Sequence, residues 1–518
     1  MNQSKGVIAA GHEQTVAAAE EILQSGGNAF DAVVAAHFAA CVAEPVLSSL
    51  AGGGFLLAQT AKDAPSLYDF FVQTPLRRRP SSEVDFFPIS ADFGETRQEF
   101  HIGMGSFATP GTVKGLFAVH RDLCTMPMNR LIEPAVALAR NGVVINAFQA
   151  YIIDIVRAVF SAYPETLEAY GSTHTPGRLA QEGDLLRQPA LADCMESLAN
   201  EGEAFFYRGE IAQEVDRMCR EQGGHVTLED LSRYDVAGRE PLKITYRDAG
   251  LAINPGPSSG GTLIAFALKL FESTDPGANP HGSADQLLTL ARVQQLTEAA
   301  RLDFMVNHNL PVPGEKMLDP DYISTFRRQI KESVRFPRGT TQISIMDNDG
   351  NTASLSTSNG EGCGRLIPGT GIMLNNMLGE EDLHPGGFQS WPENRRITSM
   401  MAPGMLNMSD GTVVAFGSGG SNRLRTAILQ VILNLTDHHM TLEKAVCNPR
   451  IHCEKGFLSV EHGFDTGELA PLLSAFSDYK IWSSSNLFFG GVHSVRRGTD
   501  GFQGVGDPRR GGVARVVS

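Results

Sequence analysis

A glycine followed by a threonine, just before a strand-like segment, is the first candidate for chemistry in this sequence. The segment reads Arg338-Gly339-Thr340-Thr341-Gln342. Glycine offers an unhindered carbonyl and tolerates strained backbone angles, so the Thr340 hydroxyl could attack it and cleave the chain before Thr340. The freed threonine would then carry its own base, the α-amine, beside its nucleophilic Oγ. The alternative is an ordinary turn from a loop into a strand.

Two further segments could complete such a site. Gly417-Ser418-Gly419-Gly420-Ser421-Asn422 precedes a predicted helix, and consecutive glycines can present backbone N–H groups to an oxyanion. A turn that simply initiates the helix would use the same residues. The adjacent hydroxyls of Thr398 and Ser399 could bind a carboxylate or cap a turn. Each segment taken by itself leaves both interpretations open.

A hairpin and several helices must position these residues. Residues 342–346 and 353–356 alternate in polarity, and the turn formers 347–351 lie between them, which is typical of a β-hairpin. A turn centred on Asp349 would place Thr340 opposite Ser358, and a slip of one residue would break this pairing.

Helical periodicity dominates the first half of the chain. It predicts helices over 15–41, divided at Gly26-Gly27-Asn28 with Asn28 as an N-cap, and over 112–140. Strand signals occur at 55–58, 248–254 and 412–416, and glycine-rich turns lead from the last two into helices predicted at 262–271 and 424–438. Runs of helices together with strands in hairpins indicate an α+β chain.

Composition and charge exclude several classes of protein. The chain has 518 residues, of which 42% are hydrophobic, and a net charge of −15, which argues against binding to nucleic acid or to anionic lipid. Neither a secretory leader nor an apolar run of membrane-spanning length is visible. Seven dispersed cysteines without a CxxC pair are typical of reduced thiols, so we expect a cytoplasmic protein. Cys447, His452 and Cys453 fit no common zinc signature. No metal or organic cofactor is expected, because nucleophile, base and oxyanion donors would all come from the chain.

Together, the motifs resemble those of the gamma-glutamyltranspeptidase family of N-terminal-nucleophile hydrolases along nearly the whole chain. The matching segments are Gly26–Ala32, Gly52–Phe55, Thr109–Val113, Pro257–Gly261, Thr340–Thr341, Pro368–Ile372, Leu374–Asn376, Gly417–Ser421 and Asp507–Arg509. The resemblance implies an αββα sandwich of two stacked, mainly antiparallel sheets flanked by helices. It also implies cleavage between Gly339 and Thr340 into a large-subunit part (1–339) and a small-subunit part (340–518), which together form one structural domain.

The resemblance assigns catalysis to four positions. Thr340 corresponds to the nucleophile, Ser358 to a hydroxyl that contacts it, and Gly419 with Gly420 to the N–H pair of the oxyanion hole. The implied function is a self-processing threonine amidohydrolase and acyltransferase that cleaves γ-glutamyl amides of the glutathione type. The acyl group would pass to water or to an amine. The implied partners are a small-molecule amide and the two chains of one precursor, and a homodimer is left open.

The substrate-binding positions match the family less well. Thr398 and Ser399 correspond to a Ser-Ser pair that binds the donor's α-carboxylate, and Glu380 corresponds to the acid that holds its α-amine. Phe71 stands where the family has an arginine that clamps the carboxylate, and a phenyl ring cannot replace a bidentate guanidinium. Asn359 lies one residue before the position of a family asparagine, which is a glycine in this sequence.

Three other interpretations compete with this one. Phe71 would suit an amidase of the same fold that acts on a less polar acyl group, and loss of the clamp could also leave a catalytically silent binding paralogue. Gly256-Pro257-Ser258-Ser259-Gly260 fits the G-x-S-x-G pattern of a nucleophile elbow between a strand and a helix. Prolines at 255 and 257 restrict that turn, and the preceding residues look helical rather than alternating between β and α.

Overall fold

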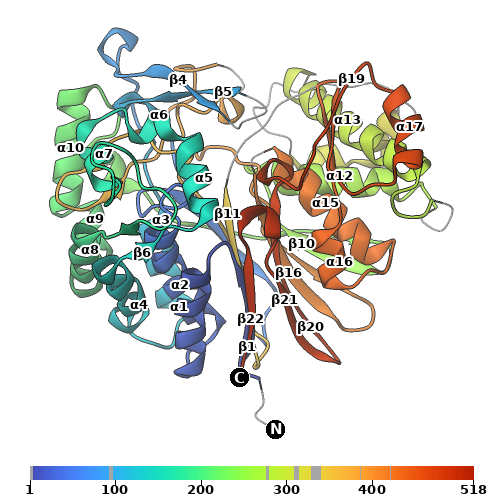
Figure 1. The fold of residues 1–518 in the computed structure, drawn as a ribbon, viewed down its shortest axis with the longest axis horizontal. Coiled ribbons are helices and arrows are strands. Elements are labelled where there is room, and N and C mark those ends of the chain that lie inside the picture. Colours follow the sequence, from blue (N-terminus) through green and yellow to red (C-terminus); the bar gives the residue numbers. More distant parts are fainter. Residues whose placement is uncertain are drawn as a thin grey trace.

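Two β-sheets stacked face to face form the centre of the molecule in the computed structural model (Figure 1). The structure describes residues 4–92, 97–275, 279–307, 314–327, 340–384, 387–420 and 422–518. In order of pairing, the first sheet contains β22 (Val513–Val517), β1 (Gly6–Ala10), β11 (Thr341–Asp347), β12 (Thr352–Ser358), β2 (Gly53–Gln59), β3 (Ser66–Phe70) and β8 (Ala237–Arg239). The second contains β21 (Gly501–Val505), β20 (Gly491–Gly498), β16 (Val413–Gly419), β15 (Gly404–Asn407), β10 (Ala249–Ile253) and β9 (Leu242–Tyr246).

Helices cover the outer face of each sheet, so the molecule has four layers (Figure 1). The first sheet is covered by α1 (Glu13–Gln24), α2 (Ala29–Ala43) and α3 (Thr112–Leu123), and the second by α12 (Gly260–Phe271), α15 (Arg423–Thr436) and α16 (Leu442–Cys447). All pairs within the two sheets are antiparallel. The α+β sandwich predicted for this sequence is therefore confirmed.

Smaller elements surround the four layers. The further helices are α4 (Met128–Asn141), α5 (Ala147–Ile155), α6 (Arg157–Phe160), α7 (Pro164–Ala169), α8 (Pro189–Glu201), α9 (Glu203–Tyr207), α10 (Glu210–Gln222), α11 (Leu228–Arg233), α13 (Ala284–Asn307), α14 (Pro320–Arg327) and α17 (Thr466–Ser474). Small sheets pair β4 (Phe87–Asp92) with β5 (Arg97–Ile102), β6 (Val143–Val144) with β7 (Leu185–Leu186), and β13 (Leu366–Ile367) with β14 (Ile372–Met373). A three-stranded sheet joins β17 (Ile451–Glu454), β18 (Phe457–Val460) and β19 (Asp478–Ile481).

The N-terminal helix pair follows directly from its sequence. Asn28 caps α2 through a reciprocal capping box with Asp31, in which each side chain accepts a backbone N–H of the other residue. Every residue of α2 is buried, because the helix lies between α1, α4 and the first sheet and is apolar on all sides. The predicted division at Gly26-Gly27-Asn28 and the predicted N-cap are confirmed.

The hairpin that carries the candidate nucleophile has the predicted register. Thr341 pairs with Thr357 and Gln342 with Ser356, so the next pair outward is Thr340 with Ser358. Since residues alternate across a strand, Ile343 and Ile345 face the helical layer while Thr340 and Gln342 face the second sheet.

One prediction near the candidate site was wrong. We predicted a strand ending near Phe416 and a glycine-rich turn after it, but β16 continues through Gly419. Gly417 to Gly419 pair with residues 491–493 of β20, so these glycines are strand residues. Gly417 is required there because a Cβ on it would lie 2.0 Å from the Gln342 amide oxygen of the facing sheet.

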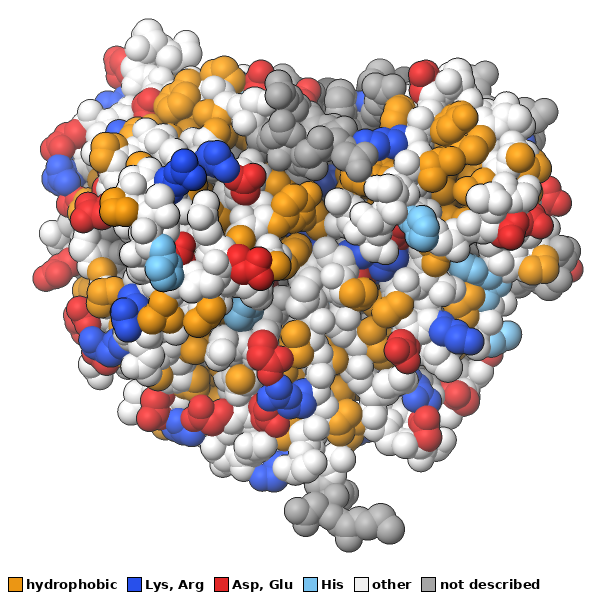
Figure 2. Space-filling model, viewed as in Figure 1, with side chains coloured by type: hydrophobic (Ala, Val, Ile, Leu, Met, Phe, Trp, Pro, Cys, Tyr) orange, Lys and Arg blue, Asp and Glu red, His pale blue; other side chains and the backbone are white. Residues whose placement is uncertain are grey.

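The surface carries charges of both signs. On the face seen in Figure 2, lysine and arginine side chains are interspersed with acidic ones. Across the described ranges, we find no helix long and apolar enough to cross a bilayer. All seven cysteines are free thiols, and Cys447 is the exposed one.

Candidate active site

Thr340 lies at the entrance to β11, on the inner face of the first sheet. Its side chain is 5% exposed, and Ser358 at the end of β12 is 4% exposed. The register places the two hydroxyl residues side by side, as predicted. Gly339, the other half of the predicted cleavage site, lies outside the described residues. The hairpin thus presents two hydroxyl residues at one corner of the space between the sheets.

The predicted glycine pair meets Thr340 at this corner. Gly419 ends β16, and a Cβ built on it would lie 1.7 Å from the Thr340 carbonyl oxygen, so the two backbones are in direct contact. Gly420 follows with φ of +123°, a conformation that side chains disfavour. The Ser418 hydroxyl fixes this turn, since it donates to Gly419 O at 2.8 Å and accepts from Gly491 N at 3.1 Å. The strand end therefore offers backbone amides next to the candidate nucleophile.

The loop after β12 brings Glu380 to the same hairpin. The Ser358 hydroxyl accepts a hydrogen bond from Gly360 N at 3.0 Å. A Cβ on Gly360 would lie 2.0 Å from Asn376 Oδ1 and 2.5 Å from Glu380 Oε1, and its φ is +65°. A side chain at position 360 would therefore displace Asn376 or Glu380 from its present position. Asn359 is 1% exposed, and within the described ranges both polar atoms of its amide lack a partner.

Thr398 and Ser399 lie on a segment that runs beside the strand exit after β3. Ile397 N donates to Val72 O at 3.1 Å, which places Thr398 next to the position of Phe71. Ser399 is buried, and its hydroxyl accepts from Met401 N at 3.0 Å. The Thr398 hydroxyl oxygen is buried and has no hydrogen-bond partner among the described residues.

The alternative nucleophile elbow is excluded by geometry. Ser258 is completely buried, and its hydroxyl donates to the carbonyls of Ser399 and Met401 at 2.7 and 3.0 Å. Ser259 N also donates to Ser399 O at 2.8 Å. The Pro-Ser-Ser-Gly turn therefore holds the Thr398–Ser399 segment in place, and its serine hydroxyl is not presented to a substrate.

Phe71 lies on the same row of the first sheet as Thr340, but its ring belongs to the core. Gly53 pairs with Ser358, and a Cβ on Gly53 would lie 2.7 Å from Val72 N and 3.0 Å from Phe71 C, so the row runs from Phe71 through Gly53 and Ser358 to Thr340. Phe71 is 1% exposed and stacks on Phe55 with 5.4 Å between ring centroids. The position of the family's arginine is thus filled by packed hydrocarbon.

The arginine nearest to Thr398 in sequence is engaged by groups of the protein itself. Arg396, the closest in sequence to Thr398, forms an ion pair with Asp69 at 3.3 Å and lies 4.8 Å over the ring of Tyr234. Its guanidinium also donates to Phe71 O and the Tyr234 hydroxyl. Arg77 and Arg78 are exposed, whereas Arg79 is half-buried and donates to the carbonyls of Cys219 and Gly224 at 2.7 and 3.2 Å.

Two charged residues near Thr340 were not predicted from the sequence. Arg510 Nη1 donates to Thr340 O at 3.0 Å, and Glu44 accepts from Thr15 and Thr341 hydroxyls at 2.8 and 3.1 Å. Burial raises the pKa of Glu44 to about 7. Arg510 directly follows the Asp507-Pro508-Arg509 motif, which the sequence analysis did identify. A motif alone, however, does not show which strand end the next residue contacts.

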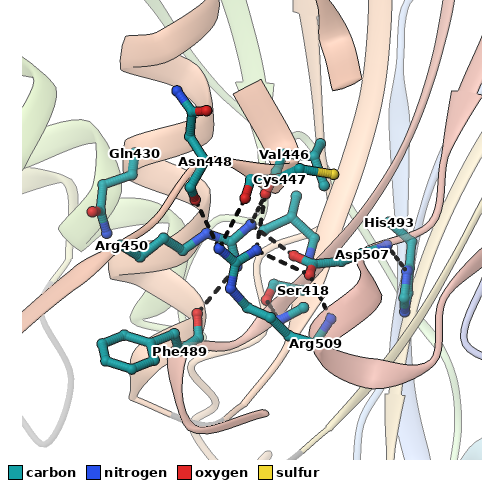
Figure 3. Close-up of polar contacts among 12 residues, drawn as sticks. Ser418, Gln430, Val446, Cys447, Asn448, Arg450, Phe489, His493, Asp507 and Arg509 are labelled. Carbon is teal, nitrogen blue, oxygen red and sulfur yellow. Dashed lines mark hydrogen bonds and ion pairs between the residues drawn. The ribbon is translucent and has the colours of Figure 1, made fainter. Parts of the chain in front are cut away.

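That motif is the centre of a buried ion network (Figure 3). Asp507 contacts Arg450 at 2.7 Å and Arg509 at 3.2 Å, and Arg509 also pairs with Glu461 at 2.7 Å. Burial alone would raise the pKa of Asp507, but the two guanidinium groups hold it at about 2. Asp507 also accepts from Val492 N at 2.9 Å. Val492 lies on β20, the strand that pairs with Gly419, so the network is connected to the candidate oxyanion turn.

Metal chemistry has no candidate centre in the ranges that the structure describes. There we find no group of three or more His, Cys, Asp or Glu side chains arranged to hold an ion. His438 and His439 lie just past the end of α15, and Asp437 is engaged by the Tyr246 hydroxyl at 2.8 Å.

Two stacked antiparallel sheets with a threonine at the entrance of an inner strand define an enzyme of the N-terminal-nucleophile hydrolase type. The family model of gamma-glutamyltranspeptidase matches residues 15–517, so the chain belongs to the gamma-glutamyltranspeptidase family. It is 29% identical to the glutathione hydrolase proenzyme of Escherichia coli, over 98% of this chain and 90% of that protein. It is also 29% identical to the acylase ACY 1 proenzyme of Pseudomonas sp. strain V22, over 96% of this chain and 91% of that protein.

Solved structures agree with this assignment. The cephalosporin acylase from Bacillus halodurans has the same fold, with a TM-score of 0.85, 23% identity, and coverage of 99% of this chain and 96% of that one. The gamma-glutamyltranspeptidase of Helicobacter pylori is 28% identical with a TM-score of 0.55, covering 63% of this chain and 91% of that one. The chain is therefore a gamma-glutamyltranspeptidase-like amidohydrolase or transferase.

Proposed function

We propose that this protein is a self-processing threonine amidohydrolase and acyltransferase with Thr340 as its nucleophile. In processing, Thr340 Oγ attacks the Gly339 carbonyl and the C–N bond breaks, which frees the Thr340 amine and leaves an ester between Gly339 and Oγ. Water then hydrolyses this ester, which releases the Gly339 carboxylate and the Thr340 hydroxyl and separates the two chains. In turnover, Oγ attacks the substrate amide while the α-amine takes the proton and passes it to the leaving amine. Water or an acceptor amine then resolves the acyl-enzyme ester.

The observation that carries this proposal is the contact between Gly419 and Thr340. Attack on an amide carbonyl is accelerated by N–H donors within hydrogen-bond reach of the oxyanion that develops. The contact between Gly419 and the backbone of Thr340, and the positive φ of Gly420 beside it, support this role for the glycine pair. The name proenzyme, which both relatives carry, also supports processing of this chain.

Intact mass of the purified protein tests the proposed processing. The wild type should give two chains, residues 1–339 and 340–518, and Thr340→Ala should give one. Thr341→Ala is a matched control, because its hydroxyl faces Glu44 on the opposite side of the strand, and it should still be cleaved. A wild-type chain that stays whole after prolonged incubation would overturn the processing step.

For the acyl group, our first candidate is γ-glutamyl. Glu380 would pair with the ammonium of the donor, as its place beside Gly360 and Ser358 supports. The buried polar atoms of Asn359 and Thr398 favour a polar ligand, since an unpartnered buried polar group costs about 1–3 kcal/mol. The glutathione hydrolase of Escherichia coli is similar along almost its whole length.

A second candidate is an acyl group that lacks the α-carboxylate. Phe71 supports it, because the site has packed aromatic rings where the family has a guanidinium, and Arg396 is already engaged by Asp69 and Tyr234. The similarity to an acylase proenzyme agrees with this alternative.

A matched series of p-nitroanilides separates the two candidates. The acyl groups would be γ-glutamyl, 4-aminobutyryl without the carboxylate, glutaryl without the ammonium, and butyryl with neither. With Glu380 retained and the arginine absent, we expect similar kcat/KM for the first two and much lower values for glutaryl. A preference of more than about 100-fold for γ-glutamyl over 4-aminobutyryl would reveal a carboxylate clamp. It would contradict the inference that the site lost its clamp when Phe71 replaced the arginine. Turnover of 4-aminobutyryl or butyryl faster than that of γ-glutamyl would favour the second candidate.

A further inference from the structure

Arg510 is a buried cation whose guanidinium touches the candidate nucleophile. It ends the short 3-10 turn η6 (Pro508–Arg510), is 3% exposed, and donates from Nη1 to Thr340 O at 3.0 Å. Its Nε and Nη2 atoms are buried and have no hydrogen-bond partner among the described residues. A Cβ on Gly419 would lie 2.9 Å from Nη1, so the guanidinium lies between the oxyanion turn and the start of β11.

The fold fixes this arginine through the buried ion network. Asp507 Oδ1 accepts from Arg509 N at 3.0 Å, and Asp507 N donates to His493 Nδ1 at 3.1 Å, as Figure 3 shows in part. The turn is thereby tied to β20. The stem of Arg510 runs over Gly491, where a Cβ would lie 2.5 Å from Arg510 Cδ. The network and the glycine together direct the guanidinium toward Thr340.

The other charges around this corner leave Arg510 poorly compensated. Burial raises the pKa of Glu44 to about 7, so its carboxylate is only partly charged at neutral pH. Asp507 is ionised but is shared with Arg450 and Arg509. Burial lowers the pKa of His12, after β1, and of His493, to about 4 for the latter, so both are neutral. Burial also lowers the pKa of Arg510 itself, but only to about 10. In the segment after β12, the buried acidic residues Glu361 and Glu380 lie near Gly360.

We propose that Arg510 is a positioning residue that locks the Thr340 carbonyl in place and keeps the freed Thr340 amine in its uncharged, proton-accepting form at neutral pH. This inference rests on the proposed threonine chemistry. The α-nitrogen is three bonds from the carbonyl oxygen that Arg510 holds, so a buried positive charge lies close to the amine. A like charge disfavours the protonated amine and lowers its pKa, which makes it a better base near pH 7.

Three variants test this role. Arg510→Met removes the charge but keeps a similar stem, and Arg510→Lys keeps the charge without the forked donor. Arg217→Met makes the same change as the first at a partly exposed, paired arginine on α10. The readouts are chain cleavage by intact mass and the pH profile of kcat/KM with whichever anilide of the series is turned over fastest. Arg217→Met should match the wild type.

We expect the acidic limb of Arg510→Met to move to higher pH by about one unit or more, because loss of the cation raises the amine pKa. Arg510→Lys keeps the positive charge, so the acidic limb of its pH profile should stay where it is in the wild type. Its kcat should fall, because the forked donor is lost. An unchanged limb in Arg510→Met, with activity reduced equally at all pH values, would show a merely structural role and overturn the proposal. If that variant does not fold, the amine of ¹⁵N-threonine-labelled wild type is titrated by NMR. A pKa clearly below the ordinary range of about 7.7–8.0 supports the proposal, and a value in or above that range overturns it. An uncleaved wild type would instead refute the processing on which the proposal rests.

Discussion

Gly419 has no space for a side chain, and this gives a quantitative prediction for Gly419→Ala. The built Cβ would lie 1.7 Å from Thr340 O and 2.9 Å from Arg510 Nη1. Because carbon and oxygen atoms do not approach much closer than about 3 Å, either the strand end or the nucleophile must move by about 1 Å or more. Misplacing reacting groups by about 1 Å costs about 10²-fold, and loss of an oxyanion donor costs about 10²–10³-fold in kcat.

The assay for this variant is kcat with the best anilide, together with intact mass and thermal unfolding. We expect kcat to fall by about 10²-fold or more, with a stability loss of about 1–3 kcal/mol from overpacking. Gly250→Ala is the matched control, since Gly250 lies on β10 of the same sheet and a Cβ there meets nothing within 4 Å. A folded Gly419→Ala protein that turns over substrate as fast as Gly250→Ala would refute the reasoning about the oxyanion corner.

Three other outcomes are expected. Thr340→Ser keeps the hydroxyl and the amine, so intact mass should show cleavage and kcat should fall only about tenfold; an uncleaved protein would contradict this. Because burial raises the pKa of Glu44 to about 7, its contribution to stability is complete below about pH 4.5 and is lost as pH rises through 7. In denaturant unfolding at several pH values, the free energy of unfolding of the wild type should fall with rising pH by about 3 kcal/mol more than that of Glu44→Gln. The same pH dependence in both proteins would contradict the raised pKa of Glu44. Asp507→Asn leaves two buried arginines without their shared carboxylate and should cost about 3–5 kcal/mol, whereas Asp500→Asn, at an exposed pair with Arg496, should change little; equal effects would argue against the network.

The sequence was sufficient to predict local features of the hairpin and helices. The alternation around Asp349 predicted the register that pairs Thr341 with Thr357, because turn formers and periodicity act over a few residues. Asn28 was predicted as an N-cap for the same reason. Each of these features is determined by residues close together in the chain.

Contacts between distant segments could not be predicted in this way. The glycines of β16 were interpreted as a turn, because their strand partner β20 lies more than 70 residues further along the chain. The hydrogen bond from Arg510 to Thr340 spans 170 positions, and it depends on an ion network whose members come from separate elements. The proximity of Gly360 to the side chains of Asn376 and Glu380 is likewise a contact between separate segments.

Trapping the acyl-enzyme is the most direct test of Thr340 as nucleophile. The protein is mixed with its fastest anilide, quenched with acid during turnover, and the small chain is digested and sequenced by mass spectrometry. We predict one acyl group in ester linkage on the N-terminal residue of a chain that begins with Thr340. An adduct on any other residue, or steady turnover by a chain that still joins residues 339 and 340, would contradict the mechanism.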